Sequence, residues 1–70
     1  MQEWQTETHE AIYHAGHLVI TNKVENKCGI VRLHDMKGRD ITLAQFRDGI
    51  KTSGLEKTMR AFSRLVRSWQ

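Results

Sequence analysis

The chain changes near its middle from segments rich in β-branched residues to apolar residues at helical spacing. The β-branched segments are residues 18–24 and 29–34, which is typical of strands. From Leu43 onward, apolar residues recur every three or four positions, which predicts helices. Strands followed by helices indicate a single α+β domain over residues 1–70. We expect a small antiparallel meander of two or three strands, followed by two C-terminal helices packed on it.

The meander is predicted from two strong segments and one weaker segment. Residues 18–24 and 29–34 are the strong segments, and Glu25-Asn26-Lys27 suits the hairpin loop between them. Residues 9–14 predict a third strand, joined to the next one through Ala15-Gly16. The alternative for the N-terminal region is a short helix with Trp4, Ala11 and Ile12 on one side.

Alternation places apolar side chains on both faces of the predicted sheet. Leu18 and Ile20 share one face of their strand, whereas Val19 lies on the other face. In the next strand, Val31 lies opposite Ile30. Either both faces are covered within the domain, or a second copy covers one of them. A chain this short gains stability from such an assembly, so a homodimer is expected.

Two helices are expected after a turn at residues 35–40. Thr42 with Gln45, and Ser53 with Glu56, match the capping-box pattern of a helix start. The second helix is predicted to run to about Ser68. Its predicted core stripe consists of Leu55, Met59, Phe62, Leu65, Val66 and Trp69.

The opposite side of the second helix is purely basic. At about 100° per residue, the basic positions point away from the core stripe. They are Lys57, Arg60, Arg64 and Arg67. Arginine offers a planar, bidentate fork that suits phosphate or carboxylate groups. Further cations that could extend this surface are Lys37, Arg39, Arg47 and Lys51.

Charge is distributed unevenly along the chain, whose net charge is +3. Residues 1–35 carry three Lys or Arg and five Asp or Glu, whereas residues 36–70 carry eight and three. A basic second half favours an anionic partner, either nucleic acid or an acidic protein.

Several functional classes lack support in the sequence. Cys28 is the only cysteine, so an internal disulfide framework is excluded. The N-terminal segment is acidic, unlike a signal peptide, and the longest apolar run is Leu18-Val19-Ile20. We therefore expect a cytoplasmic protein that does not bind membranes. The isolated glycines do not form a phosphate-binding loop.

Histidine and cysteine do not follow a metal-site or catalytic pattern. His14, His17, His34 and Cys28 are ligand types, but their spacing matches no zinc motif. A dyad of Cys28 and His34 is the single nucleophile–base combination considered. The sequence thus favours a non-enzymatic protein without metal, cofactor or small-molecule substrate.

The leading hypothesis is a small nucleic-acid-binding domain, with DNA as the expected ligand of the basic helix face. The alternative is a small inhibitor or adaptor that docks an acidic protein, of the kind encoded by phages and mobile elements. A further hypothesis is a helix-turn-helix formed by residues 43–52 and 55–69. The match is weak, because Ile50 occupies a position at which that motif favours a small residue.

Overall fold

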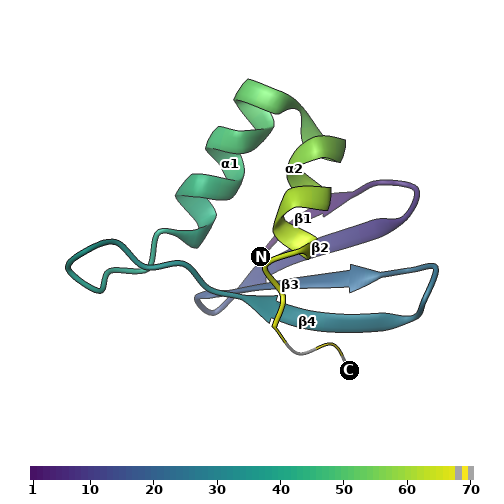
Figure 1. Ribbon diagram of the computed structural model, residues 1–70, viewed down its shortest axis with the longest axis horizontal. Helices are drawn as coiled ribbons and strands as arrows, with labels where there is room; N and C mark the ends of the chain where they lie inside the picture. The colour runs from purple at the N-terminus through teal and green to yellow at the C-terminus, as the bar shows by residue number, and fades with distance from the viewer. Residues whose placement is uncertain (68, 70) are drawn as a thin grey trace.

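A four-stranded antiparallel sheet precedes two helices in the computed structural model, which describes residues 1–67 and Trp69 (Figure 1). The sheet is a simple meander in which each strand pairs with the next along the chain. The α+β prediction is confirmed, with one strand more than expected. The elements are β1 (Gln2–Gln5), β2 (His9–His14), β3 (His17–Asn22), β4 (Lys27–Val31), α1 (Thr42–Ser53) and α2 (Leu55–Ser63).

The additional strand is β1, so the alternative of an N-terminal helix is wrong. The register of β1 pairs Trp4 with Ala11 of β2. Alternation then turns Trp4 toward the helices and leaves Glu3 exposed on the opposite face. A strand at this position brings the indole onto the core, where its ring meets Phe46 edge-on with 4.9 Å between centroids.

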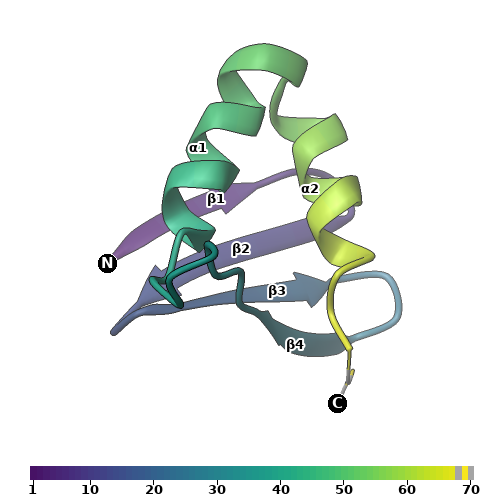
Figure 2. The ribbon, with the colours of Figure 1, turned by 60° about the vertical axis from the view of Figure 1, so that its left-hand side comes forward.

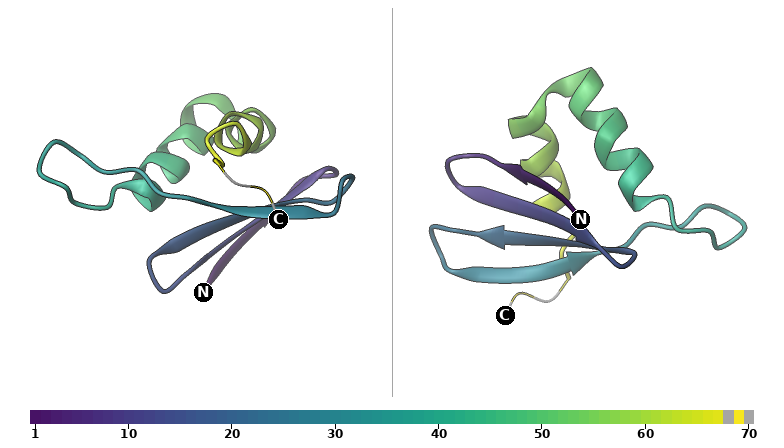
Figure 3. Two further views of the ribbon diagram at one scale, coloured as in Figure 1. Left: turned by 60° about the horizontal axis from the view of Figure 1, so that its bottom comes forward. Right: turned by 180° about the vertical axis from the view of Figure 1, so that it is seen from behind.

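Both helices lie on the same side of the sheet, which gives the domain two layers (Figures 2 and 3). Phe46 of α1 is fully buried and also contacts Phe62 of α2 edge-on, with ring centroids 5.0 Å apart. Leu18, Ile20 and Val31 all lie on the inner face of the sheet, so the shared face predicted for Leu18 and Ile20 is confirmed. The buried apolar core consists of Ala11, Leu18, Ile20, Val31, Phe46, Met59, Phe62 and Val66.

The outer face of the sheet carries an apolar row that neither helix covers. The strand register aligns Ile12, Val19 and Ile30 on neighbouring strands of this face. Ile30 is 53% exposed. The sequence prediction of apolar groups on both faces is thus confirmed, and one of these faces is open within the described chain.

A tight two-residue turn connects β2 to β3. His14 and His17 pair across it, and both intervening residues have positive φ, 52° for Ala15 and 80° for Gly16. These angles define a type I′ turn, whose twist matches that of the flanking strands. Glycine adopts this conformation freely, whereas in alanine it is destabilising because the Cβ approaches the following carbonyl.

The β3–β4 loop is longer than predicted and covers residues 23–26. The side-chain oxygen of Asn22 accepts hydrogen bonds from the amides of Val24 and Glu25, both at 3.0 Å. Asn26 then adopts a positive φ of 55°. This local bonding turns the chain before Val24, so the predicted strand boundary at that residue is wrong.

The segment between β4 and α1 is held by hydrogen bonds to Leu33. The Leu33 amide donates to Thr42 Oγ1 at 2.7 Å, and the Ile41 amide donates to the Leu33 carbonyl at 2.9 Å. The predicted capping box of Thr42 and Gln45 is wrong, because the buried Thr42 hydroxyl serves Leu33 and the N-cap is Ile41.

Gly54 alone connects α1 to α2. Its φ of 89° and ψ of 162° belong to a region that side-chain-bearing residues avoid. Ser53 is the last residue of α1 and Gly54 is the N-cap of α2, so the second predicted capping box is also wrong. The Gly54 carbonyl accepts the Thr58 amide and thereby starts α2.

The second helix ends at Ser63, earlier than predicted. The following amides bond three residues back, as in the Leu65 amide to the Phe62 carbonyl at 3.0 Å, so the chain tightens into a 3₁₀-like turn. This turn buries Val66 but leaves Leu65 45% exposed, so the core prediction is wrong for Leu65. Trp69 packs against the core as expected, and the predicted end at Ser68 lies outside the described residues.

The two helices approach each other closely at Gly49. A Cβ at this position would lie 3.0 Å from Cγ2 and 3.1 Å from Oγ1 of Thr58. Thr58 is only 3% exposed, and its branched side chain has few alternative rotamers on a helix. Gly49 therefore serves close helix packing.

Replacing Ala15 with asparagine is expected to stabilise the domain by about 0.5–1 kcal/mol, because asparagine tolerates the left-handed conformation better than alanine. Thermal unfolding followed by circular dichroism should show a rise of about 3–6 °C. Ala15→Val is the matched control and should lower the midpoint. A lower midpoint for Ala15→Asn would contradict this account of the turn.

Gly49→Ala is expected to destabilise the protein, although alanine favours a helix by about 1 kcal/mol. The added methyl group would press against Thr58. In a Thr58→Ala background, the same substitution should instead be stabilising. Urea unfolding of both single variants and the double variant measures this coupling. Additive free energies would show that the two side chains do not conflict.

Candidate functional site

Three cations form an exposed line along the outer side of α2, here called the basic ridge: Lys57, Arg60 and Arg64. Lys57 and Arg60 lie within the helix. Arg64 caps its C-terminus with φ −72° and ψ −17°, so helical spacing extends to this residue. At about 1.5 Å per residue, the ridge spans roughly 10 Å.

The charge of the basic ridge is uncompensated within residues 1–67 and 69. The ion pairs of this part of the chain join Lys27 to Glu25, Arg32 to Asp40 and Arg39 to Asp35. None involves the ridge. Like charges at helical spacing destabilise a helix by a few tenths of a kcal/mol per pair. None of the ion pairs of the described chain offsets this repulsion.

Arg67 is separated from the basic ridge, contrary to its predicted place on the same helix. The helix ends before this residue, and the chain bends toward β4 after burying Val66. Arg67 instead lines a groove beside β4. The predicted set of four aligned cations is therefore reduced to three.

The turn at residues 35–40 carries two other predicted site residues, Lys37 and Arg39. It projects beyond the start of α1 on the side away from α2 (Figures 1 and 3). Arg39 Nε lies 2.8 Å from Asp35 Oδ2, so its charge is partly neutralised. The structure does not bring these residues to the basic ridge. Arg47 and Lys51 are exposed on α1.

Asp35 and Asp40 organise this turn, as their positions in the sequence predicted. Hydrogen bonds from the Arg39 amide and guanidinium, and from the Lys37 amide, lower the pKa of Asp35. The Thr42 amide donates to Asp40 Oδ1 at 2.9 Å, and this bond, followed by the Arg32 guanidinium, lowers the pKa of Asp40. Both carboxylates are therefore structural.

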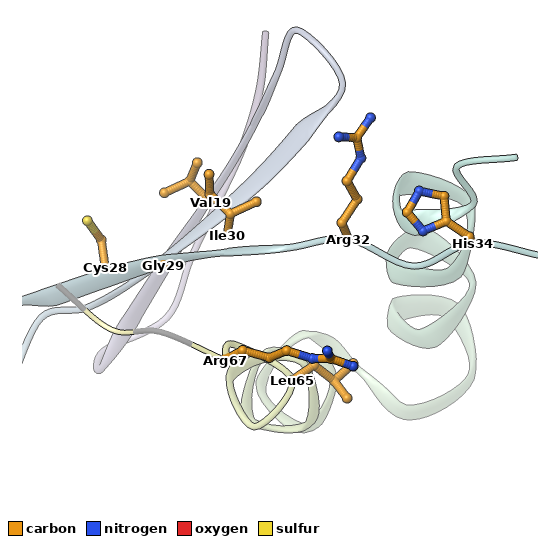
Figure 4. A pocket seen from close by; sticks show the side chains of 8 residues that line it. All are labelled: Val19, Cys28, Gly29, Ile30, Arg32, His34, Leu65 and Arg67. Atoms are coloured by element: carbon orange, nitrogen blue, oxygen red, sulfur yellow. The ribbon is translucent and has the colours of Figure 1, made fainter. Parts of the chain in front are cut away.

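A groove of about 680 Å³ follows β4, the last strand of the sheet (Figure 4). Figure 4 shows Val19 and Ile30 on one side of β4, and Leu65 and Arg67 from the C-terminal segment on the other. Sequence reasoning missed this groove, because it depends on where the chain goes after α2. Its lining residues are Val19, Cys28, Gly29, Ile30, Arg32, His34, Leu65 and Arg67.

The hypothetical dyad of Cys28 and His34 does not form. The two side chains lie at opposite ends of the groove (Figure 4), and six residues of extended chain separate them by about 20 Å. His14 and His17 flank the β2–β3 turn as expected. Within the described residues, three side chains of metal-ligand type do not gather at any one place. Neither described helix is long and apolar enough to cross a membrane.

Comparisons with known proteins found no matching family model, no matching curated protein and no matching solved structure. The functional inference therefore depends on the chemistry of the two surfaces described above, the basic ridge and the β4 groove.

Asp40→Asn is expected to lower stability at neutral pH and to have little effect in strong acid. The folded pKa of Asp40 lies below its ordinary value of 3.8, so its charge stabilises the fold above that pH. This contribution is lost as the pH falls through the folded pKa. Urea unfolding at about pH 7 and about pH 2.5 tests the change.

Asp48→Asn is the matched control, because the Asp48 carboxylate makes no ion pair within the described chain. A stability difference between wild type and Asp40→Asn that stayed constant with pH would contradict the role given to the Asp40 charge.

Proposed function

We propose that this protein is a small non-enzymatic domain that binds the sugar–phosphate backbone of nucleic acid, with duplex DNA as the expected ligand. The observation that carries the proposal is the basic ridge, three exposed cations whose charge is not balanced within the described residues. Two of the three are arginines, which bind phosphate oxygens with a bidentate fork.

The basic ridge suits contact with a short stretch of nucleic-acid backbone. Its three cations provide about three phosphate contacts, one for each side chain. Contacts of this kind position a protein on a duplex without reading its bases. We therefore propose binding that depends on backbone charge rather than on a particular sequence.

A helix-turn-helix mode receives no support from the helix connection. That motif joins its helices by a turn of about three or four residues. Here a single residue, Gly54, separates α1 from α2. The proposal consequently involves the side of α2 that faces away from the sheet, and no inserted recognition helix.

Fluorescence anisotropy of labelled mixed-sequence oligonucleotides tests the proposal. Three phosphate contacts predict that the logarithm of the association constant falls with the logarithm of salt concentration with a slope of about −2.7 for duplex. The corresponding slope for a single strand is about −2.1. Replacing all three ridge cations with glutamine should reduce the steepness by about one for each substitution.

The matched control replaces the same number of exposed cations elsewhere, Lys37, Arg47 and Lys51, with glutamine. If both triple variants lose affinity equally, net charge rather than the basic ridge drives binding. Absence of binding by the wild type at low salt would overturn the proposal. That result would favour the alternative from the sequence, in which the basic ridge is a docking surface for an acidic protein.

A further inference from the structure

At the outer edge of β4, backbone groups point away from the sheet and pair with no other strand of the described chain. His14 and His17 flank a two-residue turn, which makes them a hydrogen-bonded pair of the ladder. Alternation across β3 then directs the amides and carbonyls of Cys28, Ile30 and Arg32 away from β3. Within the described residues, these groups make no backbone hydrogen bond at that edge.

The groove beside this edge combines apolar surface with positive charge. Val19, Ile30 and Leu65 supply apolar contacts around β4 (Figure 4). Arg67 makes no ion pair within the described chain. Arg32 binds Asp40 through Nε at 3.3 Å, and neither of its terminal nitrogens takes part in that contact. The groove can thus receive a chain that offers apolar side chains and carboxylates.

We propose that an extended, acidic segment of a partner protein binds in this groove as a fifth strand along β4. Its backbone would pair with the free groups of Cys28, Ile30 and Arg32. Addition of a strand to an exposed sheet edge is a recurrent mode of peptide recognition, in which the backbone gives affinity and side chains give specificity. Here Ile30 would contact the apolar side chains on one face of the added strand, and Arg67 would contact a carboxylate on its opposite, helix-facing side.

The charge and the hydrogen-bonding groups of the groove argue against two other occupants. A second copy paired along β4 would bring two sets of Arg32 and Arg67 to the same edge, where like charges repel. A nucleic acid offers neither a strand backbone for the free amides nor aliphatic groups for Ile30. An acidic peptide matches both the charge and the hydrogen-bonding groups. This site is separate from the basic ridge, so it does not depend on the proposed function.

The probe is a fluorescein-labelled, end-capped peptide of alternating valine and glutamate, about six residues long, the length of an average strand. Anisotropy should detect saturable binding. Amide hydrogen exchange followed by NMR should show slower exchange at Cys28, Ile30 and Arg32 in the complex. The amides of α2 should be unaffected.

Four comparisons make the test specific. A peptide with lysine in place of glutamate, and one with Nα-methylated backbone amides, should each lose binding by about tenfold or more. Arg67→Gln should weaken binding by about two- to fivefold, as expected for one exposed ion pair. Arg60→Gln removes the same charge from the basic ridge and should leave peptide affinity unchanged.

Several outcomes would overturn the proposal. These are no saturable binding, equal binding of the lysine peptide, retention of binding after Nα-methylation, or slowed exchange confined to α2. If exchange at β4 became slower as protein concentration increased in the absence of peptide, a second copy would be identified as the occupant. The triple ridge variant should bind the peptide like wild type, which keeps this test independent of nucleic-acid binding.

Discussion

The aromatic contact of Phe46 with Trp4 and Phe62 holds the two layers of this small domain together. Each contact is edge-to-face, with ring centroids about 5 Å apart, a geometry that contributes about 0.5–1.5 kcal/mol beyond the area it buries. Phe46 belongs to α1, Trp4 to the first strand and Phe62 to the last helix. One buried ring therefore joins the beginning, middle and end of the chain.

The sequence pattern predicted the parts of the fold in which hydrophobic periodicity is long enough to read. Leu18 and Ile20 share a face of their strand, as alternation predicted, but which face is buried depends on where the helices pack. β1 was missed because it has four residues and Trp4 is its only large apolar side chain, so there is no periodicity to recognise. Helix boundaries were less predictable, because tertiary hydrogen bonds decided them. The sequence around Thr42 matches a helix-capping pattern, but the Thr42 hydroxyl accepts a hydrogen bond from the Leu33 amide instead.

The candidate site was only partly predictable for the same reason. Lys57, Arg60 and Arg64 share a helix, so their common side follows from spacing alone. Arg67 obeyed the same spacing but lies beyond the point at which the helix ends. The groove at β4 brings Ile30 near Leu65, residues far apart in the chain, and no local pattern predicts such a meeting. Contacts between distant segments require knowledge of the chain path.

The meander also has a consequence for how the molecule assembles. Every strand pairs with its neighbour in the chain, and α1 packs on the helix that directly follows it. Such local pairings cost little loop-closure entropy, so the two layers can form separately and quickly. The contact of Trp4 with Phe46 is different, because it joins residues separated by most of the sheet. Packing of the sheet on the helices, of which this contact is one part, therefore closes longer loops than any pairing within either layer.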